Sequence, residues 1–441
     1  MTSRVIAGSV LIASALIAWL AIVSTLVARG LQAAIAIGLL YVGYMALRGF
    51  QTMREAPREV SSANPSSNGE HPWVTLVVPA RNEAAVIGTA VANVAAQDYA
   101  DRSGPRFDLL VIDDGSSDAT ADMARRAGAA YGERVKVIRR DPDDGPRTKA
   151  AALNFARPFC RGEVIGVLDA DAQVAPDFLE RVMDAWGLDP QAAAIQAQRR
   201  AGNPGQGWLE AAQDEELLMD MASQCGRRAT DGTAELRGNG MFVRRERLDQ
   251  VGGWNGAALT EDLDLSTRLV AAGEHIALAP RAEAGEEAVR TLDALWRQRM
   301  RWAEGSLRRL LELGPGLVAE RRVPLSRKID FLAFTAEFLI PPLFVASILA
   351  SLVTIPLPRT ADWTVPASLF VGYCLGTLPL ALAGLGAHDV RGWRLIGRAA
   401  RGSLFLSHWL LVVPAALLRI AVAPRTTTFA QTSRASRLPD R

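Results

Sequence analysis

The most constraining feature of this sequence is that its charge-poor apolar stretches are confined to the two ends of the chain. Residues 5–28 and 31–47 form two such runs near the N-terminus, and each has roughly the 17–25 apolar residues that a helix needs to cross a bilayer. A cleaved signal peptide is the alternative for the first run, because Met1–Arg4 is short and basic. The first run is longer than the apolar core of a signal peptide, about 7–15 residues, and a second run follows after Arg29 and Gly30. The sequence therefore favours two membrane helices.

Further apolar segments lie toward the C-terminus, at residues 329–356, 363–387 and 403–423. The first contains Pro341 and Pro342, so it is compatible with a bent membrane helix or with a helix that starts in the membrane plane. The last contains Pro414 and Arg419, and both a crossing segment and a re-entrant segment are compatible with it. Together the apolar segments predict a multi-pass membrane protein.

Basic residues indicate the orientation, because they follow the second apolar run and precede the third. Basic loops stay on the cytoplasmic side, so the charged middle is predicted to be cytoplasmic and the protein to reside in the inner (plasma) membrane. The tail, residues 425–441, is also basic, which conflicts with a last segment that crosses the membrane. The topology of that segment stays open.

Net charge and cysteine content exclude several classes of protein. The formal net charge is +2 over 441 residues, which provides no basic footprint for nucleic acid. Cys160, Cys225 and Cys374 are far apart in the sequence and show the spacing of neither a zinc site nor a disulfide framework. This usage is typical of a reducing compartment.

The middle of the chain has the pattern of an α/β domain. After a Ser-, Asn- and Gly-rich linker within residues 51–72, short apolar strands alternate with helices. The expected strands are residues 73–80, 107–113, 134–139 and 164–168, and the expected helices are residues 83–97, 118–130 and 148–159. This alternation is typical of βαβ units and a mostly parallel sheet. Ligands of such sheets bind beyond the carboxyl ends of the strands.

Polar clusters follow several of those strands, namely Arg81-Asn82-Glu83, Asp113-Asp114-Gly115-Ser116 and Asp169-Ala170-Asp171. Any one of them is equally typical of a turn that ends a strand. At successive strand ends, however, they are expected to converge on one crevice. Closely spaced carboxylates repel and need a cation, and oxygen ligands suit Mg²⁺ or Mn²⁺ that bridges to substrate phosphates.

Two further positions fit chemistry in that crevice. Lys149 begins a predicted helix, where it either adds positive charge for a diphosphate or is simply exposed. Thr260-Glu261-Asp262 precedes another helix, and Thr260 is compatible with an ordinary N-cap followed by an acidic first turn. In the functional interpretation, Asp262 acts as general base on an acceptor hydroxyl.

The segment Gln298–Trp302 lies in an amphipathic helix predicted over residues 291–313. Gln298 lies three residues before Arg301 and four before Trp302, so these side chains are expected to share one helix face. An amide, a guanidinium and an indole suit a diphosphate and a sugar ring, because Arg pairs with phosphate oxygens and Trp offers a flat apolar surface. The alternative is that Trp302 packs in a core while Arg301 is solvated.

The order Asp-Asp-Gly-Ser, Asp-x-Asp, Thr-Glu-Asp and Gln-x-x-Arg-Trp, between membrane segments, resembles the membrane-integrated family 2 glycosyltransferases. It is most similar to their cellulose, hyaluronan, chitin and poly-N-acetylglucosamine synthase branch. Residues 78–83 match the opening strand of that family, and residues 149–154 resemble its Lys-Ala-Gly-Asn-Leu-Asn segment with two alanines in place of Gly-Asn. The resemblance covers about residues 74–302 and implies a GT-A, Rossmann-like domain.

The resemblance also implies a role for each motif in an inverting transfer from a nucleotide-diphosphate sugar. Asp169 and Asp171 would bring Mg²⁺ or Mn²⁺ to the diphosphate, and Asp262 would be the base. Gln298 and Arg301 would steady the leaving diphosphate, while Trp302 would stack on the acceptor. Residues 237–240 correspond to a loop near the acceptor site. The donor-binding residues would be Pro79, Arg81, Glu83, Asp113, Asp114, Lys149 and Asp169.

Two acceptors are compatible with the sequence. The Gln-x-x-Arg-Trp motif tilts the interpretation toward a growing polysaccharide, with UDP-glucose or UDP-N-acetylglucosamine as donor, and the alternative is a single transfer to a lipid. Few membrane segments are available for a polymer channel, so export would need a homo-oligomer or an export partner. A degenerate, non-catalytic scaffold is the alternative outside enzymes, and it is disfavoured because Asp169, Asp171 and Asp262 are all present.

The expected organisation follows from these segments. It comprises a membrane hairpin (1–50), a linker (51–72), a catalytic domain (73–290), interface helices that carry Gln-x-x-Arg-Trp (291–328), C-terminal membrane or interface helices (329–424) and a basic tail (425–441).

Overall fold

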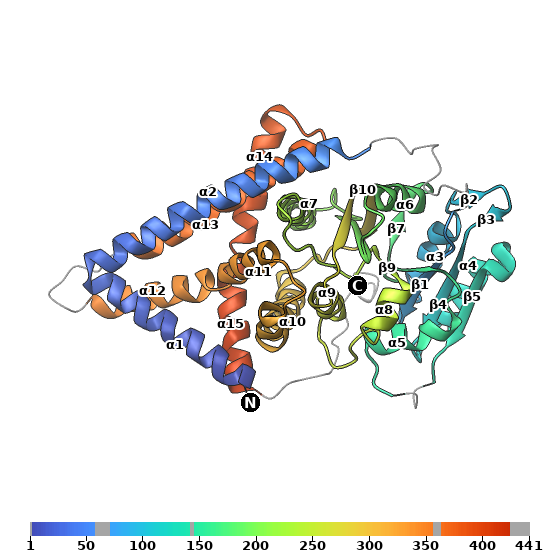
Figure 1. Cartoon of the computed structure of the whole chain (residues 1–441), viewed down its shortest axis with the longest axis horizontal. Helices are drawn as coiled ribbons and strands as arrows, with labels where there is room; N and C mark the ends of the chain where they lie inside the picture. Colours follow the sequence, from blue (N-terminus) through green and yellow to red (C-terminus); the bar gives the residue numbers. More distant parts are fainter. Residues whose placement is uncertain (1, 58–70, 142–144, 356–362, 424–441) are drawn as a thin grey trace, which may run out of the picture. The chain divides into compact units, whose positions relative to one another are not determined.

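The computed structural model describes residues 2–57, 71–141, 145–355 and 363–423 (Figure 1). These residues divide into two compact units. The sheet unit comprises residues 53–57, 71–141, 145–217 and 233–290, and the helical unit comprises residues 2–52, 218–232, 291–355 and 363–423. The expected basic tail and most of the expected linker lie outside the described residues.

The sheet unit is built on an eight-stranded sheet in the order β5-β4-β1-β6-β9-β8-β10-β7. The strands are β1 (Val74–Ala80), β4 (Phe107–Asp113), β5 (Val135–Arg139), β6 (Val164–Val167), β7 (Gln173–Val174), β8 (Ala194–Ala201), β9 (Met241–Arg244) and β10 (Ile276–Glu286). A separate short ribbon pairs β2 (Ala100–Asp101) with β3 (Gly104–Pro105).

Most strands of this sheet run in one direction, as the sequence predicts. β5, β4, β1 and β6 pair in parallel, and β8 pairs in parallel with β10. β9 lies antiparallel between β6 and β8, and β7 is antiparallel to β10. The four predicted strands are confirmed as β1, β4, β5 and β6, with ends that differ by no more than one residue.

Helices cover both faces of the sheet, which is why its strands are apolar on both sides. One face packs against α3 (Ile87–Ala95), α4 (Thr120–Gly128) and α6 (Phe178–Leu188), and the other against α5 (Lys149–Ala156), α8 (Arg245–Gln250) and α9 (Glu261–Ala271). Short 3₁₀ turns at Ala129–Arg134 and Arg157–Phe159 follow α4 and α5. The predicted helices at residues 83–97, 118–130 and 148–159 correspond to α3, α4 and α5.

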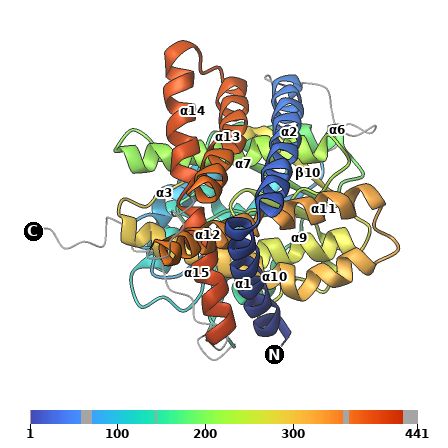
Figure 2. The ribbon, with the colours of Figure 1, turned by 90° about the vertical axis from the view of Figure 1, so that its left-hand side faces the viewer.

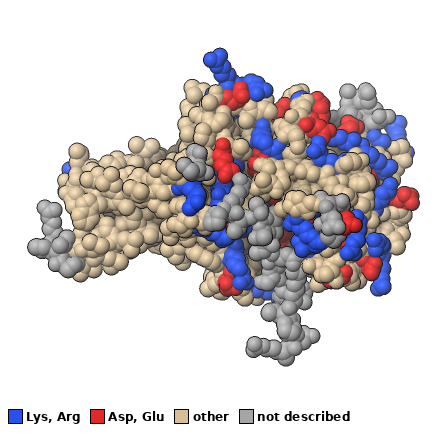
Figure 3. All heavy atoms as spheres, turned by 90° about the horizontal axis from the view of Figure 1, so that it is seen from below, with Lys and Arg blue, Asp and Glu red and all other residues tan. Residues whose placement is uncertain are grey.

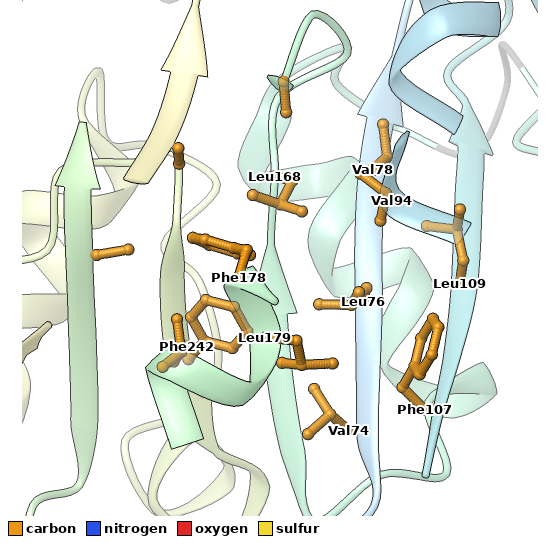
Figure 4. Packing of buried hydrophobic residues seen from close by; sticks show 14 of the residues in the cluster. Val74, Leu76, Val78, Val94, Phe107, Leu109, Leu168, Phe178, Leu179 and Phe242 are labelled. Atoms are coloured by element: carbon orange, nitrogen blue, oxygen red, sulfur yellow. The ribbon is translucent and has the colours of Figure 1, made fainter. Parts of the chain in front are cut away.

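Alternation along β1 shows how the core is divided. Val74, Leu76 and Val78 point to the face covered by α3, α4 and α6, whereas Val77 points to the opposite face (Figure 4). On the first face Phe242 of β9 packs beside α6. All of these side chains are buried, so the sheet is held by apolar packing on both faces.

The helical unit contains the long apolar helices. Its elements are α1 (Thr2–Val23), α2 (Thr25–Glu55), α10 (Leu292–Ala319), α11 (Leu325–Glu337), α12 (Ile340–Thr354), α13 (Thr364–Ala387), α14 (Gly392–Leu406), α15 (Trp409–Val422) and the second half of α7 (Trp208–Arg228). Among the described residues, five stretches are long and apolar enough to cross a membrane: Ser3–Val23, Thr25–Glu55, Leu325–Thr354, Thr364–Ala387 and Gly392–Val422.

Two boundaries near the N-terminus differ from the expectation. The first two helices meet at Ser24, so the expected break at Arg29 and Gly30 is wrong. A single glycine costs a helix only about 1 kcal/mol and does not end it. Residues 51–55 also belong to α2 and not to a linker.

Small residues and ion pairs hold the helical unit together. Gly49 and Gly226 bring α2 and α7 so close that a Cβ on either glycine would overlap backbone of the other helix, as is common between membrane helices. Arg227 forms a two-pronged ion pair with the buried Asp330 of α11, with an Nη2–Oδ2 distance of 3.0 Å.

Figure 2 shows α1 beside α15, and Arg4 donates to the carbonyl oxygens at the end of α15. On the face shown in Figure 3, the end of this unit formed by α1, α2, α12 and α13 carries few charges.

Gly166 provides a test of the packing of the sheet. A Cβ at this position of β6 would overlap the ring of Phe242 and lie 2.8 Å from Cδ2 of Leu76. Overpacking of a core costs about 1–3 kcal/mol, so Gly166→Ala is expected to lower the melting temperature by several degrees. Thermal unfolding of the solubilised protein measures this. Gly256→Ala is the control, because its Cβ meets nothing within 4 Å, and equal melting temperatures for the two variants would contradict the packing described.

Candidate active site

Charged side chains gather where β6 ends and where α5 and α9 begin. Thr148 caps α5, since its side chain accepts a hydrogen bond of 3.1 Å from the backbone N–H of Ala151. This cap fixes Lys149 as the first residue of the helix. A positive charge at a helix N-terminus is unfavourable, so Lys149 depends on nearby carboxylates.

Lys149 is the centre of a charge cluster. Its Nζ lies 2.5 Å from Oδ1 of Asp169, which follows β6, and 3.6 Å from Oε1 of Glu261 in the first turn of α9. Burial lowers the pKa of Lys149, but Asp169 and Glu261 outweigh burial and raise it above its ordinary value. Lys149 therefore stays charged at neutral pH.

Two acids begin α9, of which Glu261 is buried and Asp262 is partly buried. Burial raises the pKa of Glu261 to about 7, with the charge of Lys149 opposing the rise and that of Asp262 adding to it. Burial also raises the pKa of Asp262 above its ordinary value, against Lys149 and the backbone N–H of Leu263. An acid whose pKa is raised toward neutrality is a better proton acceptor in a transition state than an ordinary carboxylate.

The loop at residues 237–240 lies against these groups. Gly238 has a φ of +80°, and a Cβ there would lie 3.3 Å from Oδ2 of Asp262 and 3.6 Å from Nζ of Lys149. The next residue, Asn239, accepts a hydrogen bond of 3.1 Å from the backbone N–H of Asp169 and donates to the carbonyl oxygen of Gly285 at 3.2 Å. The loop is thus tied to both the Asp-x-Asp segment and β10.

The first acidic motif is engaged in local contacts. Asp113, fully buried at the end of β4, accepts from the backbone N–H of Ser116 at 3.0 Å and lies 3.6 Å from Nη1 of Arg139. Asp114 pairs with the buried Arg140 at 2.5 Å. Both acids therefore shape the turn after β4.

The loop after β1 is joined to that same turn. The backbone N–H of Asn82 donates to Ser116 at 2.9 Å, and that of Glu83 donates to Thr120 at 2.7 Å. Pro79, Arg81 and Glu83 are only partly buried here. Residues 79–83 and 113–116 thus form one continuous edge, as their strand positions predict.

Asp169 and Asp171 offer carboxylate oxygens after β6. Asp171 is almost buried, and its Oδ2 accepts a hydrogen bond of 2.9 Å from the backbone N–H of Glu287. Within the described part of the chain, no three His, Cys, Asp or Glu side chains are close enough to hold a metal ion. The pair fits Mg²⁺ or Mn²⁺ if substrate phosphates complete the oxygen shell, which is how Mg²⁺ is usually bound.

Gln298, Arg301 and Trp302 lie on α10 in the helical unit, and each is partly buried. The predicted helix is confirmed, and Thr291 caps it by accepting from the backbone N–H of Ala294 at 3.2 Å. Arg299, between Gln298 and Trp302 in sequence, is almost fully buried. These residues belong to the helical unit, whereas Lys149, Asp169, Glu261 and Asp262 belong to the sheet unit.

Sequence reasoning misses two residues of the sheet-unit cluster. Glu261 has no assigned role in the sequence interpretation, and its place in the acidic first turn of α9 is the signal that could identify it. Asn239 has no sequence signal, because its bonds to Asp169 and Gly285 join segments that are 70 and 46 residues away. Thr260, by contrast, occupies the N-cap position of α9 without a side-chain cap bond.

Gly238 provides a test of the loop. Gly238→Ala places a methyl group against Asp262 and Lys149, and because small displacements of catalytic groups cost up to about 100-fold in rate, we expect a large loss of activity. Gly252→Ala is the matched control, since Gly252 has a φ of +81° and nothing within 4 Å of its Cβ. Turnover of both purified variants measures the difference. Equal losses would mean that backbone strain, and not the approach to Asp262, is responsible.

Comparisons with known proteins agree with this geometry. The family described as "Glycosyltransferase like family 2" matches residues 71–305. Beta-monoglucosyldiacylglycerol synthase from Synechocystis sp. is 32% identical over 399 residues, which cover 88% of this chain and 81% of that protein. Poly-beta-1,6-N-acetyl-D-glucosamine synthase from Staphylococcus aureus is 28% identical over 257 residues, 57% of this chain and 59% of that protein.

The fold also matches a solved structure. A mannosyltransferase from Pyrobaculum calidifontis, in complex with GDP-Man and Mn²⁺, has a TM-score of 0.57 at 21% identity and covers 89% of this chain and 99% of its own. The expected GT-A domain flanked by apolar helices is thereby confirmed. This chain belongs to the family 2 glycosyltransferases.

Proposed function

We propose that this enzyme transfers a single sugar from a nucleotide-diphosphate sugar to a hydroxyl group of a membrane lipid, with UDP-glucose as donor and diacylglycerol as acceptor. The observation that carries glycosyl transfer is the cluster of Lys149, Asp169, Glu261 and Asp262 beyond the carboxyl end of β6. The lipid acceptor is supported by the beta-monoglucosyldiacylglycerol synthases, whose similarity extends over 88% of the chain and so reaches beyond residues 71–305 of the family match.

Asp262 is the proposed general base. The acceptor oxygen attacks the anomeric carbon, its proton passes to Asp262, and the bond to the diphosphate breaks with its electron pair leaving on the phosphate oxygen. A positioned carboxylate base typically contributes about 10²–10⁴-fold to the rate. The burial that raises the pKa of Asp262 improves it as a proton acceptor.

Lys149, Asp169 and Asp171 are proposed to bind the diphosphate. Lys149 supplies a buried positive charge that can interact with phosphate oxygens, held between two carboxylates until the donor arrives. Asp169 and Asp171 would hold Mg²⁺ or Mn²⁺, which when bound neutralises charge that develops on the leaving group. This assignment agrees with the all-oxygen donor set of the two residues.

The remaining predicted residues are proposed to bind the donor and the acceptor. Pro79, Arg81, Glu83, Asp113 and Asp114 form the edge that we assign to the nucleoside. Gln298 and Arg301 are assigned to the diphosphate, and Trp302 to the acceptor. Arg and amide donors stabilise negative phosphate oxygens, and an indole provides a flat apolar surface.

Polysaccharide synthesis is the second candidate function. An N-acetylglucosaminyltransferase from Rhizobium leguminosarum bv. viciae is 26% identical over 78% of this chain, and the poly-N-acetylglucosamine synthase matches over 57%. Both similarities are weaker than that to the lipid glucosyltransferase, and this is why we favour the lipid acceptor. A polymer would also require a homo-oligomer or an export partner, for which the chain provides no separate support.

The donor and acceptor are tested together. Membranes that contain the protein are incubated with radiolabelled UDP-glucose, UDP-N-acetylglucosamine or GDP-mannose, with diacylglycerol and Mg²⁺ or Mn²⁺. We expect one labelled lipid from UDP-glucose that carries one sugar, and loss of product when a chelator removes the metal. A ladder of products would instead favour polysaccharide synthesis, and consumption of no donor would contradict the enzyme assignment for these substrates.

Asp262 is tested by substitution and by pH. Because a base must be deprotonated, kcat/KM is expected to rise with pH as the proton leaves Asp262. The raised pKa places this rise above the ordinary carboxyl value of about 3.8. Asp262→Asn removes the base and is expected to lower kcat by about 10²–10⁴-fold. A pH–rate profile of both proteins is the measurement.

Asp122→Asn is the matched control for this substitution. Asp122 is an exposed acid of the same unit that pairs with Arg125 at 3.0 Å, so its loss should leave both kcat and the profile unchanged. Full turnover by Asp262→Asn would refute the base assignment without affecting the donor and acceptor assignments.

A further inference from the structure

One buried arginine organises the Gln-x-x-Arg-Trp segment. Arg299 is 1% exposed, although it lies on a helix whose neighbouring Arg297 is 58% exposed at its side chain. Its Nη1 donates a hydrogen bond of 2.6 Å to Oε1 of Gln298, and its guanidinium carbon lies 4.2 Å from the ring centroid of Trp302. Arg299 thus contacts both of the neighbouring residues that are expected to bind substrate.

The contact with Gln298 fixes the orientation of its amide. A guanidinium has five N–H donors and no acceptor, so the atom of Gln298 that faces Arg299 must be the carbonyl oxygen. The NH₂ group of Gln298 is then directed away from Arg299. An amide that otherwise presents a donor and an acceptor is converted into one that presents donors.

The contact with Trp302 covers one face of its indole ring. The guanidinium of Arg299 stacks over one face of the Trp302 ring, and it also lies 6.0 Å from the ring of Trp409 on α15. The α10–α15 contact continues in apolar packing that includes Met300 and Val412. Arg299 therefore fixes the plane of Trp302 against a helix that α10 already packs on.

We propose that Arg299 is a positioning residue that makes the Gln298–Trp302 segment a hydrogen-bond donor surface. With Arg299 in place, the amide of Gln298 and the guanidinium of Arg301, three residues apart on α10, both present donors. Such a surface selects a group that offers acceptors only, and the ionised diphosphate of a sugar nucleotide has this chemistry. The identity of this ligand rests on the proposed function, whereas the action of Arg299 on Gln298 and Trp302 does not.

If Arg299 only filled space in the core, its substitutions would have different effects. Apolar residues of similar volume replace buried charged residues at little or no cost in stability when packing alone matters. Arg299→Met would then be harmless. A positioning role predicts that Arg299→Met leaves the protein folded but frees the amide of Gln298 to rotate and Trp302 to tilt. Arg299→Lys keeps a charge and one hydrogen bond to Gln298 but cannot cover the indole as a planar group.

The experiment compares the full-length protein with Arg299→Met, Arg299→Lys and the control Arg297→Met. Arg297 pairs with Asp293 at 2.7 Å on the exposed side of the same helix. We expect Arg299→Met to lower kcat for UDP-glucose by about 10- to 100-fold with a smaller change in KM, as for an interaction that acts in the transition state. Arg299→Lys should recover part of this loss, and Arg297→Met should match the unmodified protein.

A double-substitution cycle separates positioning from packing. If Arg299 acts through Gln298, then Arg299→Met should cost much less in a Gln298→Ala background, because interacting residues are not additive. Additive losses, or a kcat of Arg299→Met within about twofold of the control variant, would overturn the proposal.

A spectroscopic measurement does not depend on the substrates. The emission of Trp302 is obtained as the difference between proteins with and without Trp302→Phe, and we expect Arg299→Met to shift it while Arg297→Met does not. An unchanged Trp302 emission would also overturn the proposal. If the unmodified protein fails to glucosylate diacylglycerol, the proposed function fails, while the emission still decides the role of Arg299.

Discussion

The sheet unit places several carboxylates close together at one edge of its sheet, and the repulsion between them must be neutralised. Asp169, Glu261 and Asp262 come from two segments, and their mutual repulsion in a buried site would destabilise the fold without a counter-charge. Lys149 supplies that charge from the first turn of α5, where the helix dipole disfavours it. The cluster therefore depends on Lys149, and it leaves both Glu261 and Asp262 with pKa values above those of ordinary carboxyl groups.

The fold was predictable where the sequence pattern is local. β1, β4, β5 and β6 are short apolar runs bounded by turn residues, and these features suffice to identify them. β8 and β10 contain charged side chains, and a register irregularity between Ala279 and Glu283 interrupts their pairing. Such strands resemble loops in the sequence. The position of β9 between β6 and β8 depends on long-range pairing that no periodicity encodes.

The candidate site was predictable in its charged motifs and not in the residues that orient them. Motif residues are recognisable because their types follow from the chemistry they perform. Asn239 and Arg299 act through contacts with residues that carry the motifs, and a buried asparagine or arginine has no distinctive sequence pattern. The unusual burial of Arg299, beside the exposed Arg297, becomes visible only when α10 packs on α15.

The hydrogen bonds of Asn239 have a consequence for how this enzyme can diversify. The loop that lies against Asp262 is joined through one side chain to the backbone of Asp169 and to the end of β10. A mutation that reshapes the loop for a different acceptor therefore also displaces the segment that we assign to the donor. We expect the range of acceptors to differ among close relatives through substitutions outside residues 237–240. A substitution within this loop would also weaken binding of the donor.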